Sequence, residues 1–230
     1  MDDSLKKYII LSEKSWHNSL YQTLAASLQG KWILISKKEE FTIEILTELK
    51  PDIIFIPHWS YIITPDIFKT FDCIVFHMTD LPFGRGGSPL QNLIALGYKE
   101  TMISALKVEK GIDSGNIYLK KKLLLHGKAS EIFERASLVI KEMIEEIVLN
   151  EPIPQLQEGE PVYFKRRAKK DGDIGSLVEL EKVYDYIRML DCEGYPNAFL
   201  ETNNFRFEFF NAFLSDTDKS ITANVRIIKK

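Results

Sequence analysis

The sequence predicts an α/β fold: a Rossmann-like, mostly parallel sheet with flanking helices, followed by a small C-terminal α+β subdomain. Over the first 150 residues, short apolar runs alternate with segments of helical periodicity, which is typical of a doubly wound sheet. A proline-bearing segment at 151–161 then interrupts this pattern. Beyond it, aromatic residues alternate as they do in antiparallel strands. Hydrophobic residues make up 45% of the 230 positions, which is ample for a full core.

Four apolar runs are the expected strands of the first half. They lie at residues 8–11, 32–35, 53–56 and 73–76. Helices are predicted between them at 15–29, 41–49 and 65–70. Leu20, Leu24 and Leu28 recur at helical spacing in the first of these helices, and Thr42 is the expected N-cap of the second. This half should therefore build a sheet covered by helices.

The second half continues with further helices and strands. We expect helices at 90–96, 129–150 and 177–190, strands at 101–106 and 117–125, and antiparallel strands within 199–228. In the longest helix, residues from Ile132 to Ile147 form an apolar stripe that belongs to the core. The predicted organisation is a catalytic domain at 1–150, a linker at 151–163 and a small subdomain at 164–230.

Composition narrows the possible classes of function. The formal net charge of −3 does not favour nucleic acid as a partner, because phosphate binding depends on clustered Lys and Arg. Cys73 and Cys192 form no ligand pattern, so we expect free thiols, a reducing cytoplasmic compartment and no metal. The N-terminus lacks a signal-peptide h-region, and no apolar run approaches the roughly 20 residues of a membrane span. The first strand is followed by a turn without glycine, which counts against a dinucleotide site.

Two stretches carry candidate chemistry. His77 ends the predicted strand at 73–76 and is followed by a glycine-rich loop, which is how open α/β sheets build sites. Asp113 lies between Gly111 and Gly115, just past another apolar strand. A histidine can move a proton near neutral pH, and a carboxylate can orient the ring. Each residue alone could equally be a satisfied buried histidine or a loop aspartate. We take the two as a candidate catalytic pair.

These stretches resemble a known family. The run Phe76-His77-Met78-Thr79-Asp80-Leu81-Pro82, followed by Arg85-Gly86 and Pro89, resembles the H-x-S-L-L-P-x-x-R-G-x-x-P motif of folate-dependent formyltransferases, and residues 111–115 resemble their G-x-D-x-G element. The tail at 195–199 and the pair Arg166-Arg167 are similar to the sugar-modifying members. The resemblance covers roughly residues 50–200 and places the chain in the methionyl-tRNA formyltransferase-like family, closest to its nucleotide-sugar N-formyltransferases.

The resemblance implies a function. We expect transfer of a formyl group from 10-formyltetrahydrofolate to the amine of a nucleotide-linked amino sugar. The short, acidic chain argues against tRNA as the acceptor. The expected partners are small molecules, without nucleic acid or membrane, and the apolar alternation near 205–213 leaves a homodimer possible. Two alternatives stay open: hydrolysis of 10-formyltetrahydrofolate, and a catalytically silent folate or sugar-nucleotide binding protein.

The resemblance also implies roles for individual residues. His77 stabilises the oxyanion or relays the proton, and Asp113 fixes its ring. The folate lies along Trp59, Ser60 and Tyr61 and the backbone near Val108 and Gly111, although the two aromatic rings could equally pack in the core. The acceptor is contacted by Asp80, Arg85, Gly86 and Gly87; a solvated turn is the alternative for this loop.

One position departs from the family motif. The family has an asparagine two residues before the histidine, and Val75 stands there instead. A valine cannot donate a hydrogen bond, and loss of one oxyanion donor typically costs roughly 10²–10³ in rate. Asn92, on the following helix, is an amide that could replace it, and an ordinary place on a helix surface is the alternative.

Overall fold

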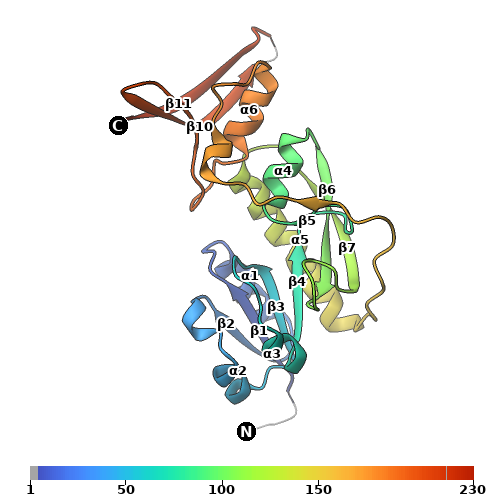
Figure 1. Cartoon of the computed structure of the whole chain (residues 1–230). Coiled ribbons are helices and arrows are strands. Elements are labelled where there is room, and N and C mark those ends of the chain that lie inside the picture. The colour runs from blue at the N-terminus through green and yellow to red at the C-terminus, as the bar shows by residue number, and fades with distance from the viewer. Residues whose placement is uncertain (1–4, 216) are drawn as a thin grey trace. The chain divides into compact units, whose positions relative to one another are not determined.

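The computed structural model describes residues 5–215 and 217–230. Its main sheet has six strands in the order β2-β1-β3-β4-β6-β7. These are β1 (Lys7–Ser12), β2 (Lys31–Ile35), β3 (Ile53–His58), β4 (Asp72–His77), β6 (Glu100–Lys107) and β7 (Ile117–Leu124). The strands β1, β2, β3 and β4 pair in parallel, whereas β6 pairs antiparallel to β4 (Figure 1). The predicted mostly parallel sheet is confirmed.

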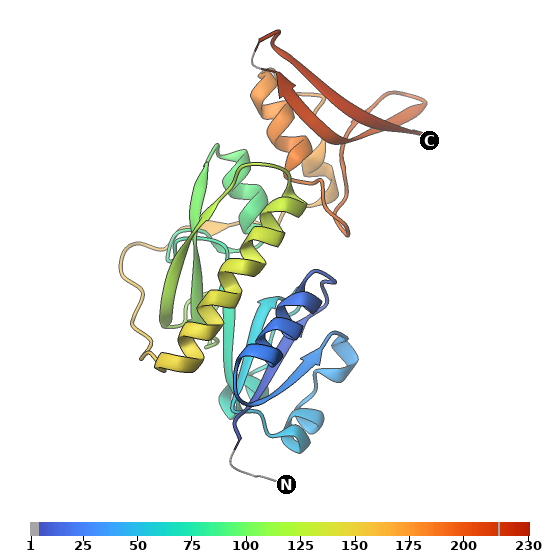
Figure 2. The same ribbon diagram turned by 180° about the vertical axis from the view of Figure 1, so that it is seen from behind.

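Helices connect these strands as the periodicity predicted. They are α1 (His17–Ser27), α2 (Ile43–Leu49), α3 (Pro65–Thr70) and α5 (Ala129–Asn150), with a short 3₁₀ turn, η1 (Lys38–Glu40), before α2. Thr42 caps α2 as expected, because its side chain accepts a hydrogen bond from the Ile45 amide at 3.4 Å. Figure 2 shows α1 and α5 in front of the sheet, on the same face.

The opposite face of the sheet packs against α2 and α3. Its buried cluster consists of aliphatic residues and one cysteine: Ile9, Leu11, Ile35, Leu46, Ile54, Ile56, Ile67 and Cys73. Leu46 and Ile67 come from the two helices and the others come from strands, so alternate strand residues face this cluster. Val75 packs against it from β4. His77 follows at the next alternate position and so lies on the same face, at the strand end.

The chain divides into two compact units that do not follow chain order. The first comprises the described residues through Arg85 together with Met102–Leu123 and Glu134–Tyr163, and the second comprises Gly86–Thr101, Leu124–Phe133 and Phe164–Lys230. The predicted boundaries at residues 150 and 164 stay a prediction. Residues 151–163 of the expected linker belong to the first unit.

The second unit contains a small antiparallel sheet and two helices. The sheet order is β11-β10-β9, from β9 (Ala198–Glu201), β10 (Phe205–Ser215) and β11 (Ser220–Lys229), and the helices are α4 (Pro89–Ala95) and α6 (Leu180–Arg188), with a 3₁₀ turn, η2 (Lys169–Gly172). Two short strands, β5 (Arg85–Gly86) and β8 (Tyr163–Phe164), pair with each other. The predicted C-terminal α+β subdomain is confirmed.

Candidate active site

His77 is the last residue of β4, and the whole residue is 8% exposed. Its Nε2 lies 2.8 Å from the carbonyl oxygen of Gly84, in the loop that follows the strand. Because a carbonyl oxygen only accepts, Nε2 carries the hydrogen and donates it. In the neutral ring, Nδ1 is then the basic nitrogen.

Asp113 faces this second nitrogen. Its Oδ2 lies 3.6 Å from His77 Nδ1, and the two side chains are 9% (His77) and 19% (Asp113) exposed. Asp113 belongs to the loop between β6 and β7, which starts beside Cys73 because the Val108 amide donates to the Cys73 carbonyl at 2.8 Å. The structure thus brings together the two side chains that the separated motifs suggested.

The glycines around Asp113 are required by close contacts. A Cβ on Gly115 would lie 1.9 Å from the Lys107 carbonyl oxygen, and one on Gly111 would lie 2.5 Å from Ser114 Oγ. Asp113 itself has φ 48°, a left-handed conformation that costs a non-glycine residue free energy, although Asp tolerates it better than most. The loop therefore folds as one tight turn that aims the carboxylate.

The loop after His77 is also fixed from within the first unit. Ser104 Oγ donates to the Thr79 carbonyl at 2.7 Å and accepts from the Leu81 amide at 3.3 Å, and both Ser104 and Thr79 are fully buried. Asp80, predicted to contact the acceptor, forms an ion pair with Lys120, and its side chain is 59% exposed. Its role in binding stays a prediction.

The predicted folate residues lie in two loops of the first unit. Trp59 packs against the aliphatic cluster and meets the rings of Phe41 at 5.7 Å and Tyr61 at 5.3 Å between centroids. Tyr61 is 42% exposed, and Ser60 is exposed as well. Val108 packs against the same cluster, whereas Gly111 is exposed. Trp59 and Val108 thus have packing roles, and the folate contacts stay a prediction.

Three other predicted residues, Gly86, Gly87 and Asn92, lie in the second unit. A Cβ on Gly86 would lie 2.5 Å from the Phe164 carbonyl oxygen, and one on Gly87 would lie 2.6 Å from Arg166 Cβ. Close approach of the chain therefore explains both glycines. Asn92 Nδ2 donates to the Gly87 carbonyl at 3.0 Å and to the Lys165 carbonyl at 2.9 Å, so both amide hydrogens are used. Their predicted substrate and oxyanion roles stay untested.

Sequence reasoning missed Gln157. The Arg85 guanidinium, predicted to contact the acceptor, donates to Gln157 Oε1 from Nε at 3.2 Å and from Nη2 at 2.7 Å, and its role in binding stays a prediction. Gln157 in turn donates to the carbonyls of Asp113 and Gly115. No local signal marks Gln157, since it lies in a proline-bearing stretch and its partners are far along the chain.

A second buried histidine lies elsewhere in the first unit. His17, at the start of α1, is 3% exposed, and its Nδ1 lies 2.7 Å from Ser12 Oγ. Ser12 Oγ also accepts from the Lys14 amide at 3.1 Å. Burial, with smaller contributions from His58 and Lys14, lowers the pKa of His17 to about 3.

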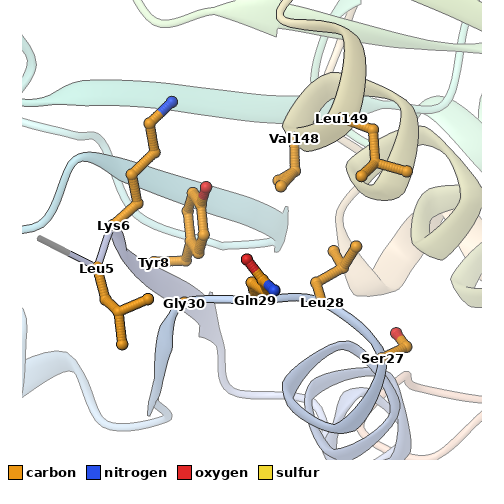
Figure 3. Close-up of a pocket in the computed structure, with 9 residues that line it drawn as sticks. All are labelled: Leu5, Lys6, Tyr8, Ser27, Leu28, Gln29, Gly30, Val148 and Leu149. Atoms are coloured by element: carbon orange, nitrogen blue, oxygen red, sulfur yellow. The ribbon is translucent and has the colours of Figure 1, made fainter.

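A pocket of about 420 Å³ opens at the amino ends of β1 and β2, away from the strand end that carries His77 (Figure 3). Its lining combines the start of the chain, the end of α1 and the last turn of α5: Leu5, Lys6, Tyr8, Ser27, Leu28, Gln29, Gly30, Val148 and Leu149. Figure 3 shows Tyr8 and Val148 directed into the gap. The pocket contains none of the predicted site residues.

Among the described residues, no group of three or more His, Cys, Asp or Glu side chains is arranged to hold a metal ion. No helix in that part of the chain combines the length and apolar character that a membrane crossing needs.

Known proteins match both parts of the chain. The model of the formyl transferase family matches residues 22–136, and that of the methionyl-tRNA formyltransferase C-terminal domain matches residues 169–228. A structure of methionyl-tRNA formyltransferase from Clostridium thermocellum is 48% identical, with TM-score 0.95, and covers 98% of this chain and 100% of its own. HypX from Aquifex aeolicus, solved with tetrahydrofolic acid, shares the fold at TM-score 0.77 and 17% identity, over 93% of this chain and 39% of its own.

A curated relative, methionyl-tRNA formyltransferase from Francisella philomiragia, is 27% identical over 201 residues, which are 84% of this chain and 64% of the relative. The chain thus spans less than two thirds of that protein. These matches overturn the expected nucleotide-sugar acceptor and the expected kinship with sugar-modifying enzymes. The exclusion of nucleic acid also conflicts with them. It rested on a short C-terminal part and net charge, yet the match to the solved Clostridium chain covers all of that chain.

The two family models cover the His77 and Asp113 motifs and most of the C-terminal subdomain, and the Clostridium structure matches the chain from end to end. The chain belongs to the formyl transferase family, whose members transfer a one-carbon formyl group.

Proposed function

We propose that this protein transfers the formyl group of 10-formyltetrahydrofolate to the α-amino group of methionyl-tRNA. The observation that carries the proposal is the placement of His77 Nδ1 at 3.6 Å from Asp113 Oδ2, with Nε2 donating to Gly84. The named relatives support methionyl-tRNA as the acceptor to test first.

The reaction requires one proton to leave the amine and one to reach the folate nitrogen. The amine forms a bond to the formyl carbon, the carbonyl oxygen becomes an oxyanion, and the bond from that carbon to N10 of the folate then breaks. His77 can accept the proton of the amine at Nδ1, since Nε2 is occupied with Gly84. The Asp113 carboxylate stabilises the resulting imidazolium.

Val75 limits how the oxyanion is stabilised. The side chain packs against the aliphatic cluster and has no hydrogen to donate. Cys73, Val75 and His77 share that face of β4, and of these three His77 carries the strong hydrogen-bonding side chain. Once protonated at both nitrogens, the ring carries a positive charge beside the reacting carbon, which favours the oxyanion.

The test uses the full chain with 10-formyltetrahydrofolate and charged methionyl-tRNA. Mass spectrometry of the amino acid released from the tRNA should detect N-formylmethionine, in a one-to-one ratio with tetrahydrofolate. Uncharged tRNA and free methionine are the controls.

Two results would contradict the proposal. Formate release at the same rate without any acceptor would indicate hydrolysis in place of transfer. Formylation of another amine, with none of methionyl-tRNA, would keep the transfer reaction and refute the acceptor.

A further inference from the structure

Residues 151–163, the connecting segment after α5, are not a free linker. Most of their side chains are exposed, including those of Leu156, Glu158 and Glu160, but Gln157 is half-buried, as are Pro152 and Pro154. Gln157 is the polar one of these three half-buried side chains.

Both ends of the Gln157 amide are fully used. Nε2 donates to the Asp113 carbonyl at 2.9 Å and to the Gly115 carbonyl at 2.8 Å. Oε1 accepts two hydrogen bonds from the Arg85 guanidinium, at 3.2 and 2.7 Å. A primary amide offers two hydrogens and two lone pairs, so this side chain satisfies its whole capacity with three residues.

The backbone of the segment is fixed on either side of Gln157. Gln155 and Ile117 exchange two hydrogen bonds, each 2.8 Å long. Val162 accepts from the Gly84 and Arg85 amides at 3.0 and 2.9 Å and donates to the Pro82 carbonyl at 3.1 Å. The segment thus holds Gln157 in place from both directions.

These bonds connect the two sides of the catalytic pair. Arg85 follows Gly84, whose carbonyl holds His77 Nε2, and Asp113 faces His77 Nδ1. Gln157 therefore bridges the loop that fixes one ring nitrogen and the loop that presents a carboxylate to the other. Asp113 adopts a left-handed conformation that persists only when its surroundings hold it.

We propose that Gln157 is a positioning residue, which keeps the Asp113 carboxylate against His77 by bonding the backbone of the Asp113 loop and the Arg85 guanidinium. This inference rests on the proposed formyl transfer for its kinetic consequences. Its structural content, the state of the His77 ring, is independent of the acceptor.

The first test is Gln157→Glu in the full chain, with Gln155→Glu as the matched control. The glutamate keeps the length and the bond to Arg85, but it replaces the amide nitrogen, which donates twice, by one oxygen that faces two carbonyls. We expect kcat to fall about 10- to 100-fold with KM for the folate changed less than threefold, because displacement of reacting groups by about 1 Å has such an effect. Gln155 is exposed and its side-chain amide donates to the nearby Ile153 carbonyl, so the control should stay within twofold.

The second test asks whether Gln157 acts through Asp113. In an Asp113→Asn background, Gln157→Glu should lower kcat by less than twofold further, because the carboxylate to be positioned is already gone. If the fold-loss of kcat in the double variant equals the product of the losses in the two single variants, the proposal is overturned and Gln157 has a general structural role.

A third measurement does not depend on turnover. The ¹⁵N chemical shifts of the His77 ring should change in Gln157→Glu and stay unchanged in Gln155→Glu. If the glutamate variant unfolds at the assay temperature, Gln157→Met, which keeps the length without hydrogen bonds, takes its place. Unchanged shifts with unchanged kcat in a folded variant would refute the inference. Altered shifts in a protein that formylates no tRNA would refute only the proposed function.

Discussion

Two histidines in the first unit are buried to a similar degree but have opposite surroundings. His77, 8% exposed, places Nδ1 beside a carboxylate. His17, 3% exposed, has the Ser12 hydroxyl at Nδ1, and burial, with smaller contributions from His58 and Lys14, lowers its pKa to about 3. A proton on His77 Nδ1 would face a carboxylate, whereas His17 is held neutral.

The difference shows that burial alone does not identify a catalytic histidine. What separates the two rings is the group that faces Nδ1, a carboxylate at His77 and a hydroxyl at His17. The following predictions test this distinction.

The largest effect is expected from His77→Gln. Removal of the proton acceptor should lower kcat for formyl transfer by about 10²–10⁴-fold, because positioned acid–base groups contribute that much. The glutamine amide can still donate toward Gly84, so the melting temperature should change little. Steady-state kinetics with His126→Gln, an exposed position, provide the control. A kcat equal to that of the unchanged protein would exclude His77 from the chemistry.

Asp113→Asn is expected to have the next largest effect. Asparagine tolerates the left-handed backbone at this position, so the loop should keep its shape. The neutral amide cannot stabilise an imidazolium as the carboxylate does, and kcat should fall about 10²-fold with little change in KM. A variant that lost folate binding instead of turnover would argue that Asp113 serves the loop and not the ring.

His17→Gln should affect stability against acid and leave kcat within twofold. In the unfolded chain this histidine binds a proton below its ordinary pKa of 6.5, whereas the folded pKa is about 3. The neutral folded form therefore loses stability as the pH falls from 6.5 toward 3, by about 1.4 kcal/mol per pH unit from this residue. Urea unfolding at pH 7, 6 and 5 should show a shallower decline in the variant. A decline as steep as in the unchanged protein would assign acid sensitivity to other groups.

The smallest effect is expected from Lys14→Met. Loss of the positive charge near His17 should raise its folded pKa slightly, because Lys14 is the weakest of the three causes that lower it. The free energy of unfolding at pH 5 should change by under about 0.5 kcal/mol relative to pH 7, since exposed charges contribute little. The variant also removes Lys14 Nζ from its position over the Trp16 ring, 5.5 Å from the centroid. A change in kcat would contradict the separation of the two histidine sites.

Local pattern predicted most of the fold. The helix at 129–150 has the bounds expected from its apolar stripe, and the four early strands fall where the apolar runs lie. The direction of β6 was not predictable, because periodicity reports which face is buried and not which way a strand runs. The antiparallel direction sets Ser104 beside His77 and Lys107 beside Ile74, so the loop with Asp113 leaves the sheet near the start of β4 and returns to His77.

The site was predictable where it is encoded in motifs and not where it depends on distant contacts. His77 and Asp113 lie in recognisable sequence, and the structure places them together. The close approach of the Phe164 backbone to Gly86 was not predictable from the sequence, and the substrate role of Gly86 stays a prediction. Gln157 bonds residues that are 42 to 72 positions away, and no local composition signals such a bond.

The path of residues 151–163 bears on where the chain can be cut. A fragment that stops at Asn150, the end of α5, would expose the Asp113 and Gly115 carbonyls and release the Arg85 side chain. A fragment that continues through Tyr163 would keep these carbonyls and the Arg85 side chain hydrogen-bonded. It would also include the C-terminal end of the first unit. When parts of relatives are exchanged or fused, the junction should therefore lie after Tyr163, where β8 begins, and not among the prolines of residues 151–161.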